Sequence, residues 1–382
     1  MAGAELGRIV SECRRFARKE VEHGLLAADD ARDASWVAGL WKKSLSLDLP
    51  ALLVPREHGG AGESDLCAAL VAGSLARWCA GLASVFAFHF AALRALSALP
   101  ENSPVKARLF SAAASSADPA MFTVILPDPS APELYEIKTQ NESPEISGRS
   151  PAAGNAALAR FFLVFAKDEA GILNLLMVPR GAAGLSFGPD PLFPGLCANP
   201  LLPVAMERIP AVSSNAADAA STARAVLLAG GSKAEKILET ARNAFFGFVA
   251  AVAVGLAEAC FEHAFDYAKN RYQFGKMIVH HSELQRMLGR MLQGIKVGRA
   301  AYTRVFEEDS AVFPNAGLGV FAKTWCADAA LSTASDCVQI FGGYGVMHEY
   351  GMEKRMRDAK MLQLLGGSTP WLLVESVKSQ LA

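Results

Sequence analysis

The chain has 382 residues, of which 52% are hydrophobic and 20% are charged, and its formal net charge at pH 7 is −1. This composition predicts a globular protein with a large buried core and excludes an intrinsically disordered chain. Because 37 basic residues nearly balance 38 acidic ones, the charge argues against nucleic acid or an anionic membrane surface as the main ligand.

Neither a targeting segment nor a membrane span is expected. The first twenty residues carry early acidic side chains and lack the apolar stretch of a signal peptide. The longest uncharged apolar run, Phe245 to Ala257, is shorter than the roughly 20 residues that a membrane-spanning helix needs. Seven scattered cysteines without a C-x-x-C pair fit reduced thiols. We therefore expect a cytoplasmic protein.

The N-terminal third of the sequence has helical periodicity. Apolar residues recur at three- and four-residue spacing from Leu6 to Ala17, and the helical pattern continues to about residue 115. Pro55 and three glycines interrupt it in "LPALLVPREHGGAGESD", where Ser64 and Asp65 are suited to cap the next helix. These features predict an α-helical domain over residues 1–118.

The pattern changes near residue 119. From there to about 212, short apolar segments such as "MFTVIL", "ARFFLVFAK", "ILNLLMVP" and "LLPVAMERIP" alternate with turn-forming residues, which is typical of strands. We expect a β-barrel or β-sandwich domain over residues 119–228. Residues 213–232 are small and weakly patterned, and we interpret them as a linker.

The C-terminal part, residues 229–382, contains long helical patterns. We predict helices over 233–270, 282–308 and about 316–341, then a glycine-rich elbow and a final helix after Thr369. Four helices with short connections form an antiparallel bundle. The overall prediction is an α+β protein, mostly α, with a β-domain between two helical domains.

Two stretches of the bundle carry a family signature. "VGLAEACFEHAFDYAKNRYQFGK" at 254–276 and "QIFGGYGVMHEYGMEKRMRDAK" at 339–360 resemble the signature regions of the acyl-CoA dehydrogenase family of FAD flavoproteins. "LLVPREHGGAGES" at 52–64 is similar to the N-terminal loop of that family. The resemblance implies an oxidoreductase that acts on the CH–CH bond of an acyl-CoA, and it extends over essentially the whole chain.

The resemblance also implies a homodimer or dimer of dimers in which FAD lies across a subunit interface. It assigns contact with the FAD of the neighbouring subunit to an R-x-x-F-G motif and a Q-x-x-G-G turn. A guanidinium pairs well with a pyrophosphate, and paired glycines let backbone N–H groups approach an anion closely. The candidate FAD-binding residues are Arg271, Phe274, Gln339, Gly342 and Gly343, together with Ser368 and Thr369. Either motif alone would be interpreted as an ordinary surface arginine or an ordinary loop between helices.

The sequence departs from this family where its chemistry is carried out. The glutamate that abstracts the α-proton in the usual member aligns with Gly366, and the position from which a minority of members supply that base falls at or next to Phe245 and Phe246. A positioned general base contributes roughly 10²–10⁴ in rate. The bulk of Phe245, Phe246 and Phe248 also suggests a filled acyl cavity. No catalytic residue is therefore assigned to this chain.

Two further segments of the β-domain differ from the family. A T-E-P-type loop is replaced by "VILPDPSAPEL" at 124–134, and a K-x-W-I-T segment by "SGRSPAAGNAA" at 147–157, so the aromatic platform for the flavin ring is lost. The elements donated to a neighbour's FAD are thus retained, whereas those that serve the subunit's own FAD are lost. Arg355, Arg357 and Asp358 are interpreted as structural ion pairs.

Three hypotheses follow. The first is a subunit that completes the FAD pocket of an acyl-CoA dehydrogenase paralogue in a hetero-oligomer, with acyl-CoA as substrate and an electron-transfer flavoprotein as possible acceptor. The second is a flavoenzyme of different chemistry, desulfinase-like or monooxygenase-like, in which Gly366 leaves room for a bulkier substituent. The third is a non-catalytic paralogue. Adjacent His280 and His281 lack a third ligand at useful spacing, so no metal is predicted.

Overall fold

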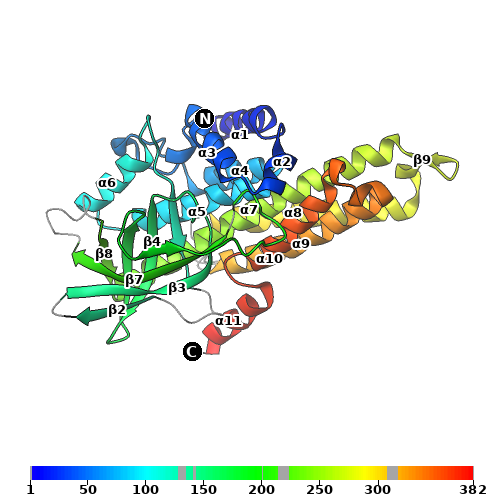
Figure 1. Ribbon diagram of the computed structural model, residues 1–382. Coiled ribbons are helices and arrows are strands. Elements are labelled where there is room, and N and C mark those ends of the chain that lie inside the picture. The colour runs from blue at the N-terminus through cyan, green and yellow to red at the C-terminus, as the bar shows by residue number, and fades with distance from the viewer. Residues whose placement is uncertain are drawn as a thin grey trace.

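The computed structural model describes residues 2–127, 135–140, 143–199, 201–213, 223–307 and 317–381. Helices come first, strands follow, and a second set of helices ends the chain, in the predicted order (Figure 1). The N-terminal helices are α1 (Ala2–Glu20), α2 (Leu25–Ala31), α3 (Ala34–Lys43), α4 (Asp65–Ala76), α5 (Ala80–Ser97) and α6 (Pro104–Ala113). The Ser64 side chain accepts a hydrogen bond from the backbone N–H of Cys67, which confirms the predicted N-cap of α4.

The middle region is a β-barrel. Its strands are β1 (Phe122–Ile125), β2 (Tyr135–Gln140), β3 (Ser143–Ala153), β4 (Phe161–Asp168), β5 (Leu173–Pro179), β6 (Leu185–Phe187), β7 (Leu202–Ser213) and β8 (Ala225–Gly230). The sheet closes because β5 pairs with both β8 and β4. Alternate apolar side chains fill its interior, among them Phe162, Leu176 and Val204.

In the described part of the C-terminal region, five helices form the bundle, which extends away from the barrel (Figure 1). They are α7 (Ser232–Asn270), α8 (Ser282–Val305), α9 (Leu318–Phe341), α10 (Met352–Leu364) and α11 (Thr369–Leu381). With 39 residues, α7 is about 58 Å long and serves as the axis of the molecule. Gly73 of α4 and Gly255 of α7 cross backbone to backbone, since a Cβ added at Gly255 would lie 2.0 Å from the Gly73 carbonyl oxygen.

Several predicted elements were wrong. The glycine-rich elbow contains α10, so the bundle has one helix more than predicted. The sequence of α10 is so rich in charged residues that its apolar face was not recognised. The interpretation of 213–232 as a linker fails at β8, which pairs with β5 and β7. Asp128–Leu134 of the altered T-E-P-type loop lies outside the described residues.

The two most apolar long helices lie in the core. In length and hydropathy α5 and α7 both qualify as membrane spans, but 89% of the qualifying window of each is buried inside the fold. The structure thus accounts for their hydropathy by packing within the protein. All seven cysteines are buried and free.

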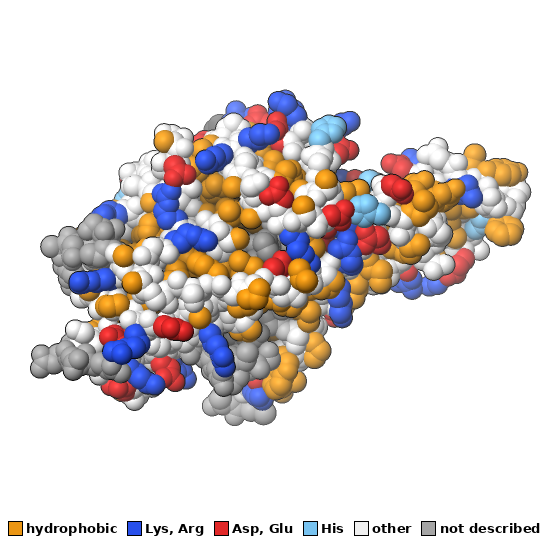
Figure 2. Space-filling view, viewed as in Figure 1, with side chains coloured by type: hydrophobic (Ala, Val, Ile, Leu, Met, Phe, Trp, Pro, Cys, Tyr) orange, Lys and Arg blue, Asp and Glu red, His pale blue; other side chains and the backbone are white. Residues whose placement is uncertain are grey.

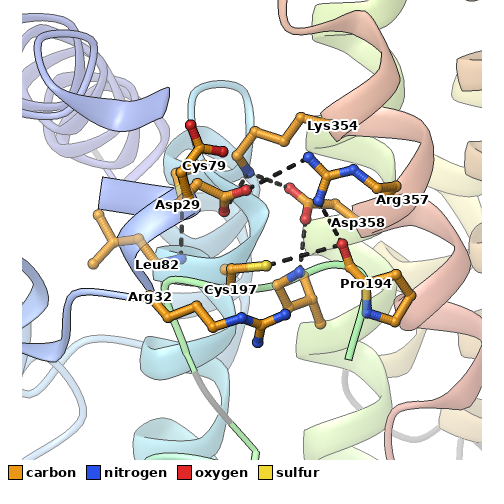
Figure 3. A network of polar contacts seen from close by, with 12 residues as sticks. Asp29, Arg32, Cys79, Leu82, Pro194, Cys197, Lys354, Arg357 and Asp358 are labelled. Atoms are coloured by element: carbon orange, nitrogen blue, oxygen red, sulfur yellow. Dashed lines mark hydrogen bonds and ion pairs between the residues drawn. The ribbon is translucent and has the colours of Figure 1, made fainter. Parts of the chain in front are cut away.

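A buried ionic network joins the three regions (Figure 3). The ammonium group of Lys354 on α10 lies 2.6 Å from a carboxylate oxygen of Asp358 and 3.2 Å from one of Asp29 on α2. Asp358 also accepts a 2.7 Å hydrogen bond from the backbone N–H of Leu196, in the loop before β7. Burial lowers the pKa of Lys354, but the two carboxylates outweigh this and raise it. Lys354 is therefore held charged in the core.

Neighbouring charged residues of α10 support the same contact. The guanidinium of Arg357 pairs with the carboxylate of Glu353 at 2.6 Å. It also donates to the Pro194 carbonyl, as Figure 3 shows. The predicted ion pairs of Arg357 and Asp358 are confirmed. Arg355 instead donates a 2.9 Å hydrogen bond to the Arg77 carbonyl.

Candidate functional site

The R-x-x-F-G motif forms a hairpin at the end of α7. Arg271 ends the helix, and the two-residue strands β9 (Tyr272–Gln273) and β10 (Lys276–Met277) pair around a turn made by Phe274 and Gly275. Both turn residues have positive φ, +55° and +82°, as a two-residue hairpin turn of type I′ requires. The Phe274 side chain is 91% exposed at the tip of the bundle, where Figure 2 shows a cluster of hydrophobic side chains.

The structure brings this hairpin next to the Q-x-x-G-G turn. The guanidinium of Arg271 lies over the ring of Tyr344, 5.9 Å from its centroid. One turn earlier on α7, the ring of Tyr267 stacks on that of Phe341 with centroids 4.3 Å apart. The two motifs are about seventy residues apart in the sequence, and these aromatic contacts join them into one exposed edge.

This edge, defined here as Arg271, Phe274, Gln339, Gly342 and Gly343, has the features of an anion-binding surface. Arg271 makes no ion pair with any residue that the structure describes, and Gln339 is exposed. A Cβ added at either glycine would meet no atom within 4 Å, so their backbone is open to approach. Gly342 has a φ of +59°, which glycine adopts without strain.

The Gly366 loop, between α10 and α11, is enclosed. A Cβ added at Gly366 would lie 2.7 Å from Cε1 of Phe245 and 3.0 Å from Cε1 of Phe246. Gly366 also has a φ of +73°, in the left-handed region that other residues occupy at a cost of about 1–2 kcal/mol. This backbone position does not accept a side chain.

A third ring completes the enclosure. Phe88 of α5 packs on Phe245 with centroids 4.7 Å apart, and a Cβ added at Gly154 of the barrel would overlap the Phe88 ring. All three rings are buried, with exposures of 7% for Phe88, 0% for Phe245 and 2% for Phe246. The expectation that Gly366 leaves room for a bulkier substituent is wrong, because these rings occupy the space.

Phe248 belongs to a different contact. It stacks on Phe306 with centroids 5.1 Å apart and packs against Phe90. Only Phe245 and Phe246 of the predicted group therefore close the Gly366 loop. Phe88 was missed by sequence analysis, because it lies in an apolar helix where nothing distinguishes one phenylalanine from the next.

Lys323 of α9 was also missed. Its side chain is fully buried, and the ammonium group donates hydrogen bonds of 2.8 Å to the Gln363 carbonyl and 2.7 Å to the Gly367 carbonyl. Gln363 lies in the last turn of α10 and Gly367 shortly after it, so a cation at these carbonyls is stabilised by the helix dipole. Lys323 thus fixes the conformation of the Gly366 loop. A lysine among apolar residues on a bundle helix was the available signal.

Ser368 and Thr369 do not join the exposed edge. They lie at the start of α11, which Figure 1 places far from the hairpin. The Ser368 carbonyl accepts a 3.0 Å hydrogen bond from the Leu372 N–H. The Thr369 hydroxyl is buried and has no hydrogen-bond partner among the described residues. The seven candidate FAD-binding residues therefore form two separate groups.

Comparisons with known proteins decide the family. Residues 4–99 match the acyl-CoA dehydrogenase N-terminal domain family and residues 239–374 match the acyl-CoA dehydrogenase C-terminal domain family, and together these matches cover more than half of the chain. The chain belongs to the acyl-CoA dehydrogenase family. The predicted family and fold class are confirmed, and so are the oxidoreductase class and FAD as the cofactor of the family.

Individual relatives of this acyl-CoA dehydrogenase family member are distant. Cyclohex-1-ene-1-carbonyl-CoA dehydrogenase of Syntrophus aciditrophicus is 26% identical over 332 residues, which are 84% of this chain and 77% of the relative. Butyryl-CoA dehydrogenase from Megasphaera elsdenii matches in structure with a TM-score of 0.87 at 21% identity, covering 99% and 98% of the two chains. The electron transferring flavoprotein structure of Acidaminococcus fermentans matches with a TM-score of 0.87 at 22% sequence identity, and the match covers 98% of this chain and 97% of that chain.

The residues present fit FAD only in part. The exposed edge offers a guanidinium and open glycine backbone, which suit the pyrophosphate of a dinucleotide. The stretch aligned with the flavin-ring platform, residues 147–157, covers the second half of β3 and the turn after it, and it contains no aromatic side chain. No group of three or more His, Cys, Asp or Glu in the described part of the chain could hold a metal ion. The edge therefore fits one end of the cofactor, and the chain's own ring site does not fit the other.

Proposed function

We propose that this chain is the non-catalytic subunit of a hetero-oligomeric acyl-CoA dehydrogenase. In this assembly it lends its exposed edge to an FAD held mainly by a catalytic paralogue. The observation that carries the proposal is the enclosed Gly366 loop, where Phe245 and Phe246 occupy the space that a catalytic carboxylate needs. The partner would supply the general base, the flavin-ring platform and the acyl-CoA site.

The residues of this chain have defined roles in the proposed assembly. FAD bound by the partner would supply the hydride acceptor for oxidation of the acyl-CoA. Arg271 pairs with the cofactor's pyrophosphate, and Gly342 and Gly343 let backbone N–H groups reach the same anion. The exposed ring of Phe274 would be available for an apolar contact with the partner subunit. The position of Ser368 and Thr369 gives them no part in this contact.

The assembly would be cytoplasmic and of the α2β2 type. The match to a structure entitled for an electron transferring flavoprotein supports such a protein as the electron acceptor. The alternative of different flavin chemistry in this chain's own site loses its support, because the rings of Phe88, Phe245 and Phe246 leave no space beside Gly366. A non-catalytic paralogue without a partner would not account for the exposed edge with its accessible guanidinium group.

The test is reconstitution. The chain is purified alone and after co-expression with each paralogue that carries the family's glutamate, and the FAD-to-chain ratio is measured by flavin absorbance and by mass in solution. We expect little FAD on the chain alone, and FAD together with dehydrogenase activity in one of the mixed complexes. One FAD per chain in an active homo-oligomer would overturn the proposal.

Two variants make the reconstitution specific. Arg271→Ala should weaken FAD binding by the mixed complex about tenfold or more, since a charge-assisted contact is lost. Arg286→Ala removes an exposed arginine from α8, where it pairs only with Glu283 among the described residues, and should leave FAD binding unchanged. Equal effects of the two variants would argue against FAD contact by the edge.

A further inference from the structure

Three sulfur atoms meet in the core of the bundle, where α7, α9 and α10 pack together. Cys260 of α7 and Cys337 of α9 are both fully buried, and Met352, the first residue of α10, is 3% exposed. Sγ of Cys337 lies 3.4 Å from Sδ of Met352. The thiol of Cys337 also donates a hydrogen bond to the sulfur of Cys260. None of the roles proposed above for this chain involves these three residues.

The two cysteines meet because α7 and α9 run side by side in the same direction. In the first turn of α9, the backbone N–H of Gly319 donates a 2.7 Å hydrogen bond to Oδ1 of Asn243 on α7. Near the ends of both helices, the ring of Tyr267 stacks on that of Phe341. Each cysteine lies one to two turns before this second contact, so the helices bring both to the same level of the bundle.

The backbones of the two helices approach closely at this level. The residues one turn away from the cysteines, Ala264 on α7 and Ala334 on α9, are small and fully buried. The sulfur of Cys337 accepts a hydrogen bond from the backbone N–H of Ala264, so it lies against the backbone of α7. A disulfide needs two Cα atoms about 4.4–6.8 Å apart, a separation that helices packed over alanine residues can reach.

The contacts of the pair make Cys260 the more reactive thiol. The hydrogen bond from Cys337 stabilises a thiolate at Cys260, so the pKa of Cys260 is lowered and the pKa of Cys337 is raised. The positive charge of Arg355 favours this thiolate as well. The guanidinium of Arg355 lies 3.3 Å from Nε2 of His263, an exposed residue one turn after Cys260 on α7. The pair thus lies close to the surface, where local opening of the structure admits a small oxidant.

We propose that Cys260 and Cys337 react with a hydroperoxide and form a reversible disulfide between α7 and α9. The thiolate of Cys260 attacks one peroxide oxygen, so an S–O bond forms, the O–O bond breaks, and the leaving oxygen takes up a proton as water or an alcohol. The sulfur of Cys337 then attacks the sulfenic acid at Cys260, the S–S bond forms, and water leaves. The two thiols lose two electrons and the peroxide gains them. A small dithiol reverses the reaction by exchange.

The disulfide would connect the helices that carry the two motifs of the exposed edge. Gln339 follows Cys337 by two residues, and Arg271 ends the helix that carries Cys260. In the reduced chain aromatic contacts join the two motifs, and in the oxidised chain a covalent bond fixes the helices behind them. The bond also closes the chain from residue 260 to residue 337, which restricts the unfolded state. This inference goes beyond the proposed function and does not depend on it.

The test is a map of the thiols of the purified, reduced chain before and after treatment with hydrogen peroxide. The remaining thiols are blocked with N-ethylmaleimide in urea, and tryptic peptides are analysed by mass spectrometry. We expect the peptide with Cys260 to be joined to the peptide with Cys337, a loss of two of the seven free thiols, and recovery of both with dithiothreitol. The midpoint of urea denaturation should rise by about 1 M in the oxidised chain.

Variants assign the reaction to this pair. In Cys337→Ala the second thiol is missing, so peroxide should leave a sulfenic acid on Cys260, which dimedone traps, and should not raise the urea midpoint. Cys326→Ala is the matched control, because Cys326 is also buried on α9 but contacts the Gly298 carbonyl, at 3.5 Å. It should form the cross-link at the rate of the unaltered chain. Arg355→Gln removes the charge that favours the thiolate and should slow the cross-link about threefold or more.

The proposal fails if peroxide produces no link between the two peptides, if other cysteines cross-link as fast, or if the fully cross-linked chain keeps the urea midpoint of the reduced chain. If Cys337→Ala does not fold, Cys260→Ala takes its place and should abolish the cross-link. All measurements use the chain alone without FAD. Failure here therefore leaves the hetero-oligomer untouched, and failure of reconstitution leaves the disulfide untouched.

Discussion

The exposed edge and the enclosed Gly366 loop belong to the same helical bundle but differ in exposure, in packing and in the accessibility of their backbone groups. The edge presents an exposed guanidinium, two open glycines and a phenylalanine that is 91% exposed. The loop lies beneath three buried phenyl rings, and its carbonyls are held by the buried ammonium group of Lys323. The difference shows that one half of a composite site can keep its binding geometry while the other half becomes ordinary core.

Gly366→Glu gives the largest expected effect on stability and tests whether the loop is as closed as the geometry indicates. Left-handed backbone costs about 1–2 kcal/mol and overpacking a further 1–3 kcal/mol, with more for a buried carboxylate, so the free energy of unfolding should fall by about 4 kcal/mol. Urea denaturation measures this. Gly343→Ala, which meets no atom within 4 Å, is the matched control and should change stability little. A stable, active Gly366→Glu variant would show that the rings around the Gly366 loop move aside readily.

Phe245→Ala tests the enclosure from the other side. Removing this fully buried ring leaves a cavity against Phe88 and Phe246, so the free energy of unfolding should decrease by about 3–5 kcal/mol. The matched control is Phe274→Ala, whose exposed ring should contribute less than about 0.5 kcal/mol. Similar losses in the free energy of unfolding for the two variants would show that the Gly366 loop is not more tightly packed than the exposed edge.

A buried histidine outside the Gly366 loop should also give the protein a pH dependence. His89 of α5 is fully buried and neutral: its Nε2 lies 2.7 Å from the Pro50 carbonyl, and its Nδ1 accepts a hydrogen bond from the Phe122 N–H. Burial lowers the pKa of His89 to about 4, from 6.5 in the unfolded chain. Between these values the unfolded chain binds the additional proton, so the free energy of unfolding falls as pH falls.

The expected loss is about 3 kcal/mol when the pH drops through this whole window, and none of it occurs above the pKa of the unfolded chain. Urea denaturation at about pH 7 and about pH 4.5 measures it. His89→Gln should reduce the difference between the two pH values, whereas His23→Gln, at an exposed position, should not. An unchanged difference in His89→Gln would mean that other groups, such as His263, whose pKa is also lowered, carry the pH dependence.

Arg271→Ala has the smallest expected effect on stability among these variants. It separates a role of the exposed edge in cofactor binding from a role in the fold. The guanidinium is exposed and contacts only the face of Tyr344 among the described residues, so the free energy of unfolding should change by less than about 1 kcal/mol. FAD binding by the mixed complex should fall about tenfold in the same variant. A large loss of stability would mean that Arg271 serves the fold, not a cofactor.

The exposed edge could be predicted because its signals are local. Arg271 and Phe274 lie within one short motif at a helix end, and the glycines after Gln339 form a turn that the sequence itself encodes. The strands rich in phenylalanine and valine, such as β4, were also predictable from their composition. The charged helix α10 was not, because its buried side includes Lys354 and Asp358, which become core residues only through Asp29.

The sequence alone determined the family, the helix–β–helix order, the motifs of the exposed edge and the absence of a glutamate at position 366. These are matters of residue identity and local periodicity. Only the tertiary structure decided what the glycine at 366 means, because Phe88, Phe245 and Gly154 come from three separate elements and meet only in the folded chain.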